Sequence, residues 1–430
     1  MTSLKIALKR LSASRFFRDV ATVMTGTTLA QIIGLILMPV ISRLYSPQDF
    51  GMFGSFLAIV GIFSTGVTLQ YHQALMLPPS DEDAFSLVGA ACLSTAVLSI
   101  LVVILSIIGQ SVAGEVFPNL HQTWVPFALG VAIFVSGLNQ TFLGWSTRRK
   151  SFRYTAISQV SRSIGAFGSQ LIGGMLRFGG LGLIVGNIFG DLMSSILIWR
   201  SVLSRDISSL RPSLSAPKVR ELASEYKDFP IFSTPQNILN SVSQGLPVLL
   251  LGYFFSVDVA GYYAFGMRIL QVPMNFIQNA LRQVLFQRLS ETLNCGGDLF
   301  QLYYKTTFGL ALVTVVPTAL GYLFAPQLFS FFFGINWSTA GEYGRWLVLW
   351  LCLGLCSLPS NLLSRVLGLQ RNLLLFEIII LSSRLFSLIL GGKYLTPTQA
   401  IAIFSLLGVF LNLSFIVCVF KYVKNFAKTN

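Results

Sequence analysis

Long apolar stretches, separated by short polar segments, dominate the pattern of this 430-residue chain. A helix needs about 20 predominantly apolar residues to cross the hydrocarbon core of a bilayer. Twelve stretches are of that length, and they predict an all-α integral membrane protein. The predicted spans are residues 20–42, 51–76, 85–108, 122–145, 153–176, 180–203, 229–254, 259–283, 303–325, 345–368, 372–391 and 396–420.

The composition also indicates a membrane protein, because 53% of the residues are hydrophobic and only 11% are charged. Soluble domains carry about 25% charged residues. A net charge of +14 would by itself suit a nucleic-acid-binding protein. Here, however, the basic residues gather in every second connection between the spans and at both termini. Connections rich in Lys and Arg face the cytoplasm. Both termini are therefore predicted to be cytoplasmic, and no nucleic acid partner is expected.

The longest polar connection, Ser204–Lys227, lies near the middle of the chain. An internal repeat supports a division there: Leu44–Gly54 resembles Phe254–Ala264, with Ser46 matching Ser256. Repeats that each contain an even number of spans have parallel orientation. The predicted divisions are an interfacial cytoplasmic helix (1–19), a six-helix lobe (20–204), a cytoplasmic linker (205–227), a second six-helix lobe (228–420) and a cytoplasmic tail (421–430).

Six charged residues fall deep in the predicted spans, where each costs about 2.5–3.5 kcal/mol on insertion scales. Arg162 and Asp191 lie equally far from one turn, and Arg365 and Glu377 lie almost equally far from another. Each pair is therefore predicted to lie at one depth and to form a salt bridge. The structural interpretation is that these bridges hold two helical hairpins together. In the functional interpretation, the two acids are candidates for coupling transport to a proton or sodium gradient.

Arg268 and Arg384 have no acid near them in the sequence, so we predict that they contribute to an anion-binding site. Polar residues recur at helical spacing around Arg268, and similar stripes occur in the spans at 153–176 and 229–254. Hydrogen bonding between helices is the alternative, but it explains one or two polar residues per helix better than a whole stripe. The predicted substrate-binding residues are Arg268, Arg384, Arg162, Arg365, Gln271, Asn275 and Asn240.

Enzyme and pump signatures are missing from the sequence. It contains neither the GxxxxGK[ST] motif of ATP-binding loops nor the HExxH motif of zinc proteases. The five cysteines, Cys295 among them, form no CxxC pair. We therefore expect a transporter with no catalytic residue, metal or cofactor.

Two stretches resemble the beginning of a known family. Pro39–Gly54 (PVISRLYSPQDFGMFG) and Ala74–Pro78 (ALMLP) are similar to bacterial polysaccharide-biosynthesis flippases, the O-antigen or Wzx-type translocases. These belong to the superfamily that also contains the MATE drug exporters and the peptidoglycan-precursor flippases. The resemblance implies two six-helix lobes that form a MATE-like V around a cationic cavity, in the bacterial cytoplasmic (inner) membrane.

The same resemblance implies a substrate and partners. The substrate would be an undecaprenyl-diphosphate-linked oligosaccharide, such as an O-antigen, capsule or exopolysaccharide repeat unit, moved from the cytoplasmic to the periplasmic leaflet by alternating access. Membrane lipids and the polysaccharide polymerase machinery would be further partners.

Two other functions stay open. A MATE-like ion-coupled antiporter of drugs or metabolites would need an acidic cavity, yet Asp191 and Glu377 are outnumbered by the deep arginines. A membrane glycosyltransferase or O-antigen ligase would need a large outside loop rich in acids or His. The longest predicted outside stretch, Ala325–Gly344, contains Glu342 as its only acid.

Overall fold

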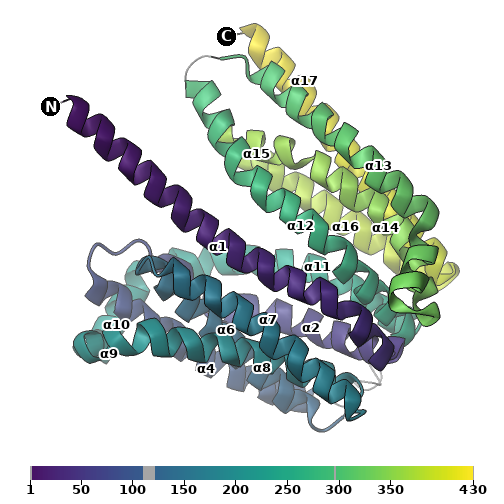
Figure 1. The fold of residues 1–430 in the computed structure, drawn as a ribbon, viewed down its shortest axis with the longest axis horizontal. Coiled ribbons are helices and arrows are strands. Elements are labelled where there is room, and N and C mark those ends of the chain that lie inside the picture. Colours follow the sequence, from purple (N-terminus) through teal and green to yellow (C-terminus); the bar gives the residue numbers. More distant parts are fainter. Residues whose placement is uncertain (1, 110–121, 295–296, 430) are drawn as a thin grey trace. The chain divides into compact units, whose positions relative to one another are not determined.

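The computed structural model describes residues 2–109, 122–294 and 297–429 of the chain. Within those ranges all regular secondary structure is helical (Figure 1), which confirms the predicted all-α class. The predicted interfacial helix at 1–19 is part of a single helix, α1 (Thr2–Leu44), although the side chains before Thr22 lie outside the described residues. Cys295 also lies outside them.

Each predicted span coincides with helical structure among the described residues. One span, 345–368, is divided between α14 and α15. The helices are α1, α2 (Pro47–Val67), α4 (Asp81–Ile108), α6 (Val125–Arg148), α7 (Phe152–Met175), α8 (Gly180–Ile198), α11 (Thr234–Phe254), α12 (Val257–Asn294), α13 (Leu299–Phe333), α14 (Ser338–Cys356), α15 (Leu358–Val366), α16 (Gln370–Tyr394) and α17 (Pro397–Thr429). Short segments join them: α3 (Tyr71–Ala74), η2 (Trp199–Leu203), η4 (Phe229–Ser233) and η5 (Ile335–Trp337).

Nine spans in the described part of the chain are long and apolar enough to cross a membrane. They leave out α7, α11 and α12, which have 24, 21 and 38 residues and therefore suffice in length at about 1.5 Å per residue. These three helices fall short only in apolarity. They are the helices that carry the predicted polar stripes.

The first of two compact units consists of Met1–Tyr45 and Ser55–Gly245. Within it, α7 packs against both α1 and α8. The Ser163 hydroxyl of α7 donates a hydrogen bond to the Ala30 carbonyl of α1 (2.7 Å). On α8, Gly190 lies directly against the α7 backbone. Small residues permit this close approach of helix backbones in a bilayer.

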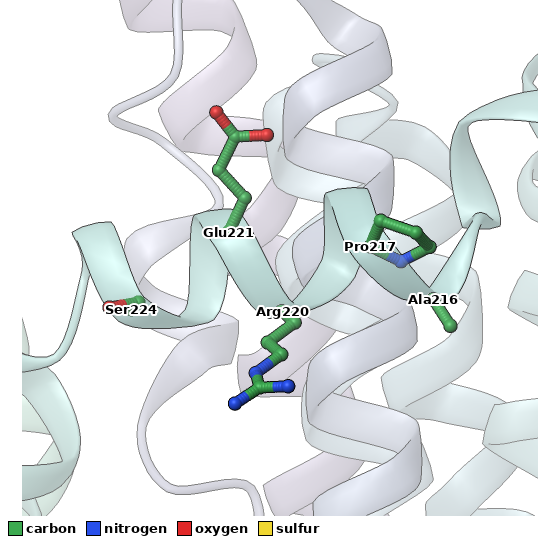
Figure 2. A pocket seen from close by; sticks show the side chains of 5 residues that line it. All are labelled: Ala216, Pro217, Arg220, Glu221 and Ser224. Carbon is green, nitrogen blue, oxygen red and sulfur yellow. The ribbon is translucent and has the colours of Figure 1, made fainter.

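The predicted linker is helical rather than extended. It forms α9 (Ser204–Leu210), the 3-10 helix η3 (Arg211–Leu214) and α10 (Ala216–Glu225). Leu222 of α10 is buried in a core cluster with residues of α4 and α6. On the outside of α10, a shallow open pocket is lined by Ala216, Pro217, Arg220, Glu221 and Ser224 (Figure 2), where Arg220 and Glu221 point away from one another.

Polar contacts hold this linker onto the first unit. The Asp206 carboxylate accepts a hydrogen bond from the Trp145 indole (3.0 Å) and forms an ion pair with Arg149 (3.1 Å). Lys218 pairs with Asp83 (2.7 Å), and this contact raises the pKa of Lys218. The linker is thus an integral part of the first unit.

Arg148, at the end of α6, ties the turn between α3 and α4 to the bundle. Its Nε pairs with Asp81 (3.0 Å). Its two Nη groups donate to three backbone carbonyls, at 2.6 Å for Leu75, 3.0 Å for Pro78 and 2.9 Å for Ser80. The side chain is only 11% exposed. One guanidinium therefore satisfies four acceptors that lie in one loop.

Replacing Arg148 by alanine is expected to destabilise the protein strongly, because three backbone carbonyls would lose their donor. Leaving a buried acceptor unsatisfied costs about 1–3 kcal/mol for each group. Thermal unfolding of the purified protein in detergent should show a midpoint lower by about 5 °C. The neighbouring Arg149→Ala variant is the control. Arg149 is 39% exposed, so its ion pairs should contribute about 1 kcal/mol or less. Equal midpoints for the two variants would contradict this account.

The second compact unit consists of Ser46–Gly54 and Leu246–Asn430, so it includes both copies of the internal repeat. The Ser46 hydroxyl accepts a hydrogen bond from the Asp49 amide (3.2 Å). The Ser256 hydroxyl accepts one from the Val259 amide (3.2 Å). The matching serines therefore cap the starts of α2 and α12 in the same way.

The two copies also contact one another at their glycines. A Cβ on Gly51 would overlap the Val257 carbonyl oxygen, and a Cβ on Gly261 would overlap the Pro47 carbonyl oxygen. Each repeat glycine thus packs on the first residue of the other repeat's helix. This reciprocal contact is local, and superposition of the complete halves stays a prediction.

Candidate functional site

Helix α12 is two-sided. Met274 is buried in the core of the second unit, and Leu281 packs against that core. On the other side Asn275 and Arg282 are exposed and Gln271 is half-buried. The helices of the second unit therefore leave this polar face uncovered. A face this polar cannot be in contact with lipid tails at bilayer depth.

The two arginines predicted to bind an anion have different surroundings. The Arg268 guanidinium, at the N-terminal end of the α12 stripe, lies 5.6 Å from the centre of the Phe53 ring. The Arg384 guanidinium lies between two rings, 3.7 Å from the centre of Trp350 and 4.0 Å from that of Phe404. Cations stabilise such contacts with aromatic faces. Arg384 is thus enclosed by aromatic side chains, and a role of either arginine in substrate binding stays a prediction.

Helix α11 carries the second polar stripe, and its first part belongs to the first unit. Asn240 is exposed and accepts a hydrogen bond from the Gln244 side chain (3.3 Å). On another side of the helix, the Ser241 hydroxyl lies 2.7 Å from that of Thr65 in α2. Hydrogen bonding between helices therefore accounts for Ser241, but not for the exposed carboxamides.

Helices α7 and α8 form the ion pair predicted from their sequence spacing. Arg162 Nε donates to Asp191 Oδ1. The Asp191 backbone carbonyl accepts bonds from Ser195 Oγ (2.8 Å) and Asn139 Nδ2 (3.4 Å). The Arg162 side chain is 44% exposed, whereas that of Asp191 is 12% exposed. The acid is fixed among helices, and the base reaches toward an open face.

The predicted ion pair between Arg365 and Glu377 is wrong: in the described part of the chain neither side chain forms a salt bridge, and both are exposed. Each lies on the outer side of its helix. Leu363, about 200° around α15 from Arg365, is fully buried. Phe376, the neighbour of Glu377, stacks on Phe415 (4.5 Å between ring centres). Equal depth did not place the two charges on facing sides.

The sequence does not indicate which residues surround Arg384. Trp350 comes from α14 and Phe404 from α17, so no spacing along the chain relates them to an arginine on α16. An aromatic content of 13% makes such contacts common, but it does not indicate where they occur.

Comparison with known proteins places the chain in a family. Residues 40–342 match the family described as "Polysaccharide biosynthesis protein". The succinoglycan biosynthesis transport protein ExoT of Rhizobium meliloti (strain 1021) is 23% identical over 339 residues. This match covers 76% of the chain and 63% of ExoT, so it spans less than two thirds of that relative.

Solved structures share the fold. The lipid II flippase MurJ in an inward closed conformation superposes with a TM-score of 0.69, at 12% identity, over 92% of this chain and 87% of MurJ. An inward-facing multidrug resistance MATE family transporter of the MOP superfamily gives a TM-score of 0.64, at 13% identity, over 95% and 94% of the two chains. Identities this low show the fold alone.

The fold is thus one that solved multi-pass transporters share, and the apolar spans agree with a multi-pass membrane protein. The family and its relatives indicate a transporter rather than an enzyme. Because the match covers residues 40–342, which is most of the chain, this protein belongs to the polysaccharide biosynthesis protein family.

Proposed function

We propose that this protein is a flippase for an oligosaccharide linked to undecaprenyl diphosphate. It would move an O-antigen, capsule or exopolysaccharide repeat unit from the cytoplasmic to the periplasmic leaflet of the bacterial inner membrane, with both of its termini in the cytoplasm. The observation that carries the proposal is the uncovered face of α12, where Asn275 and Arg282 are exposed beside half-buried Gln271.

The chemistry of this face suits such a substrate. Guanidinium groups bind phosphate oxygens through paired N–H donors, so Arg268 and Arg282 are the groups on α12 that would attract a diphosphate. Carboxamides both donate and accept hydrogen bonds, as sugar hydroxyl groups do. Gln271 and Asn275 on α12 and Asn240 on α11 are therefore suited to a glycan.

These groups would serve different parts of the substrate during transport. The diphosphate and the sugars need a polar path, whereas the lipid tail stays in the bilayer because its transfer to water costs about 0.8 kcal/mol per CH₂. Alternating access opens the polar path to one side of the membrane at a time. Asp191 and Glu377 are the acids through which a proton or sodium gradient would act, and the polymerase machinery would take over the product.

Deletion of the gene tests this function. Lipid-linked glycans should accumulate, and they should be confined to the cytoplasmic leaflet, out of reach of a periplasmic glycosidase in intact spheroplasts. Expression of the full chain should restore access and surface polysaccharide. If the deletion strain shows normal leaflet distribution but greater sensitivity to cationic drugs, the MATE-like antiporter is the better assignment.

A further inference from the structure

Helix α7 has two uncovered faces of opposite character. Its flanks are covered by α1, through Ser163, and by α8, through Gly165. Between these flanks on one side, Ile157 and Ile164 are exposed. Arg162, about 200° around the helix from Ile164, is exposed on the opposite side. Only the isoleucine face suits lipid tails.

The polar face of α7 continues above and below Arg162. Gln159 and Ser169, both half-buried, lie within about 60° of it around the helix and add an amide and a hydroxyl group. Since lipid tails cannot solvate such a face at bilayer depth, water or a polar ligand must cover it.

The contact with Asp191 uses only one side of the guanidinium. Nε is bonded to Oδ1 of Asp191. Among the described residues, no other hydrogen bond or ion pair involves the Arg162 side chain. Its two Nη groups therefore take no part in that contact. In this respect Arg162 differs from Arg384, whose guanidinium contacts two aromatic rings.

The backbone at Asp191 is fixed. Asp191 is buried, and α8 is held at that level by the hydrogen bond from Asn139 of α6 to the Asp191 carbonyl. In addition, Gly190 packs against the Arg162 backbone. A flexible arginine held at Nε by such a group loses less freedom when it binds a ligand.

The geometry points to Arg162 as an anion-binding residue of the first unit, with Asp191 as the residue that positions it. The ligand class is a diphosphate, which the two Nη groups would hold side by side as a fork. This inference rests on the proposed function for the identity of the natural ligand. It gives Asp191 the role of positioning Arg162, beside its place as a candidate coupling acid.

A purely structural ion pair is the competing explanation. Exchanging the two charged residues distinguishes this explanation from anion binding. The double variant Arg162→Asp, Asp191→Arg keeps one acid and one base at this contact. If the pair only joins α7 to α8, the exchange should restore both protein abundance and function. If Arg162 binds an anion, the exchange should restore abundance alone, since the new arginine would occupy the buried position of Asp191.

The experiment measures binding of inorganic pyrophosphate to the purified full chain by calorimetry, together with surface polysaccharide in the complemented deletion strain. The exchanged variant should bind pyrophosphate at least tenfold more weakly than the wild type and export no polysaccharide. Arg162→Lys, which keeps the charge but loses the fork, and Asp191→Asn, which loses the positioning carboxylate, should each weaken binding about tenfold. Exchange of Lys218 and Asp83, an ion pair on the linker, is the matched control and should change neither quantity.

Wild-type binding and export by the exchanged variant would overturn the inference. If that variant does not accumulate, Arg162→Lys decides: unchanged binding at normal abundance overturns the inference, and tenfold weaker binding supports it. A separate result would contradict the flippase assignment: a normal leaflet distribution of the lipid-linked glycan in the deletion strain. That result does not depend on the pyrophosphate measurements.

Discussion

Replacing Gly261 by alanine is expected to leave little folded protein in the membrane. The new Cβ would overlap the carbonyl oxygen of Pro47 and lie 2.8 Å from the amide nitrogen of Gly51. Both obstacles are backbone atoms, so no rotamer change can relieve the overlap. Overpacking of a core costs about 1–3 kcal/mol and occasionally more. We expect the upper end of that range, and a several-fold loss of abundance.

A second glycine in the same unit provides the control. A Cβ on Gly309, in α13, would meet no atom within 4 Å. Alanine is preferred to glycine inside a helix by roughly 0.5–1 kcal/mol, so Gly309→Ala should keep or slightly raise abundance. Abundance and thermal midpoint of the two variants can be compared in membranes and in detergent. Equal behaviour would show that α2 and α12 do not need this close crossing.

Replacing Arg268 by alanine should abolish polysaccharide export while protein abundance stays near normal. Arg268 is a half-buried member of the α12 stripe, and its proposed partner is the substrate diphosphate. Arg268→Lys should restore part of the export, because an ammonium acts only as a point charge. Surface polysaccharide and membrane abundance are the quantities to measure.

Arg384→Ala should behave differently, with abundance and export falling together. The guanidinium fills the space between Trp350 and Phe404, and truncation of a large buried side chain costs about 2–5 kcal/mol. The sequence predicts the same role for Arg268 and Arg384, whereas their surroundings in the structure differ. Loss of export by Arg384→Ala at normal abundance would place Arg384 at the substrate instead.

The sequence was sufficient for features that depend on local order. Apolar length predicted where the helices lie, and the internal repeat matched Ser46 with Ser256. The Arg162–Asp191 pair could be predicted because α7 and α8 join through a short turn. The same reasoning failed for Arg365 and Glu377. The helix preceding that turn breaks at Ser357 into α14 and α15, so spacing counted along one continuous helix does not apply to Arg365.

Features that depend on distant segments could not be predicted. The segment 205–227 has the composition of a solvated linker, yet Trp145 and Arg149 at the end of α6 bind Asp206 and dock it onto the first unit. The rings around Arg384 likewise come from separate helices. In both cases the deciding contacts join residues whose spacing along the chain carries no periodic signal.

The central claim is that this protein moves a lipid-linked glycan across the bilayer, and a reconstituted system tests it most directly. Purified protein would be placed in vesicles that contain the lipid-linked glycan extracted from the deletion strain. An impermeant glycosidase added outside would then measure how much of the glycan can be reached. With wild-type protein the accessible fraction should rise from about half, the outer leaflet alone, toward completion. Vesicles with Arg268→Ala should stay at about half, like vesicles without protein. Equal accessibility with and without the wild-type protein would contradict the account.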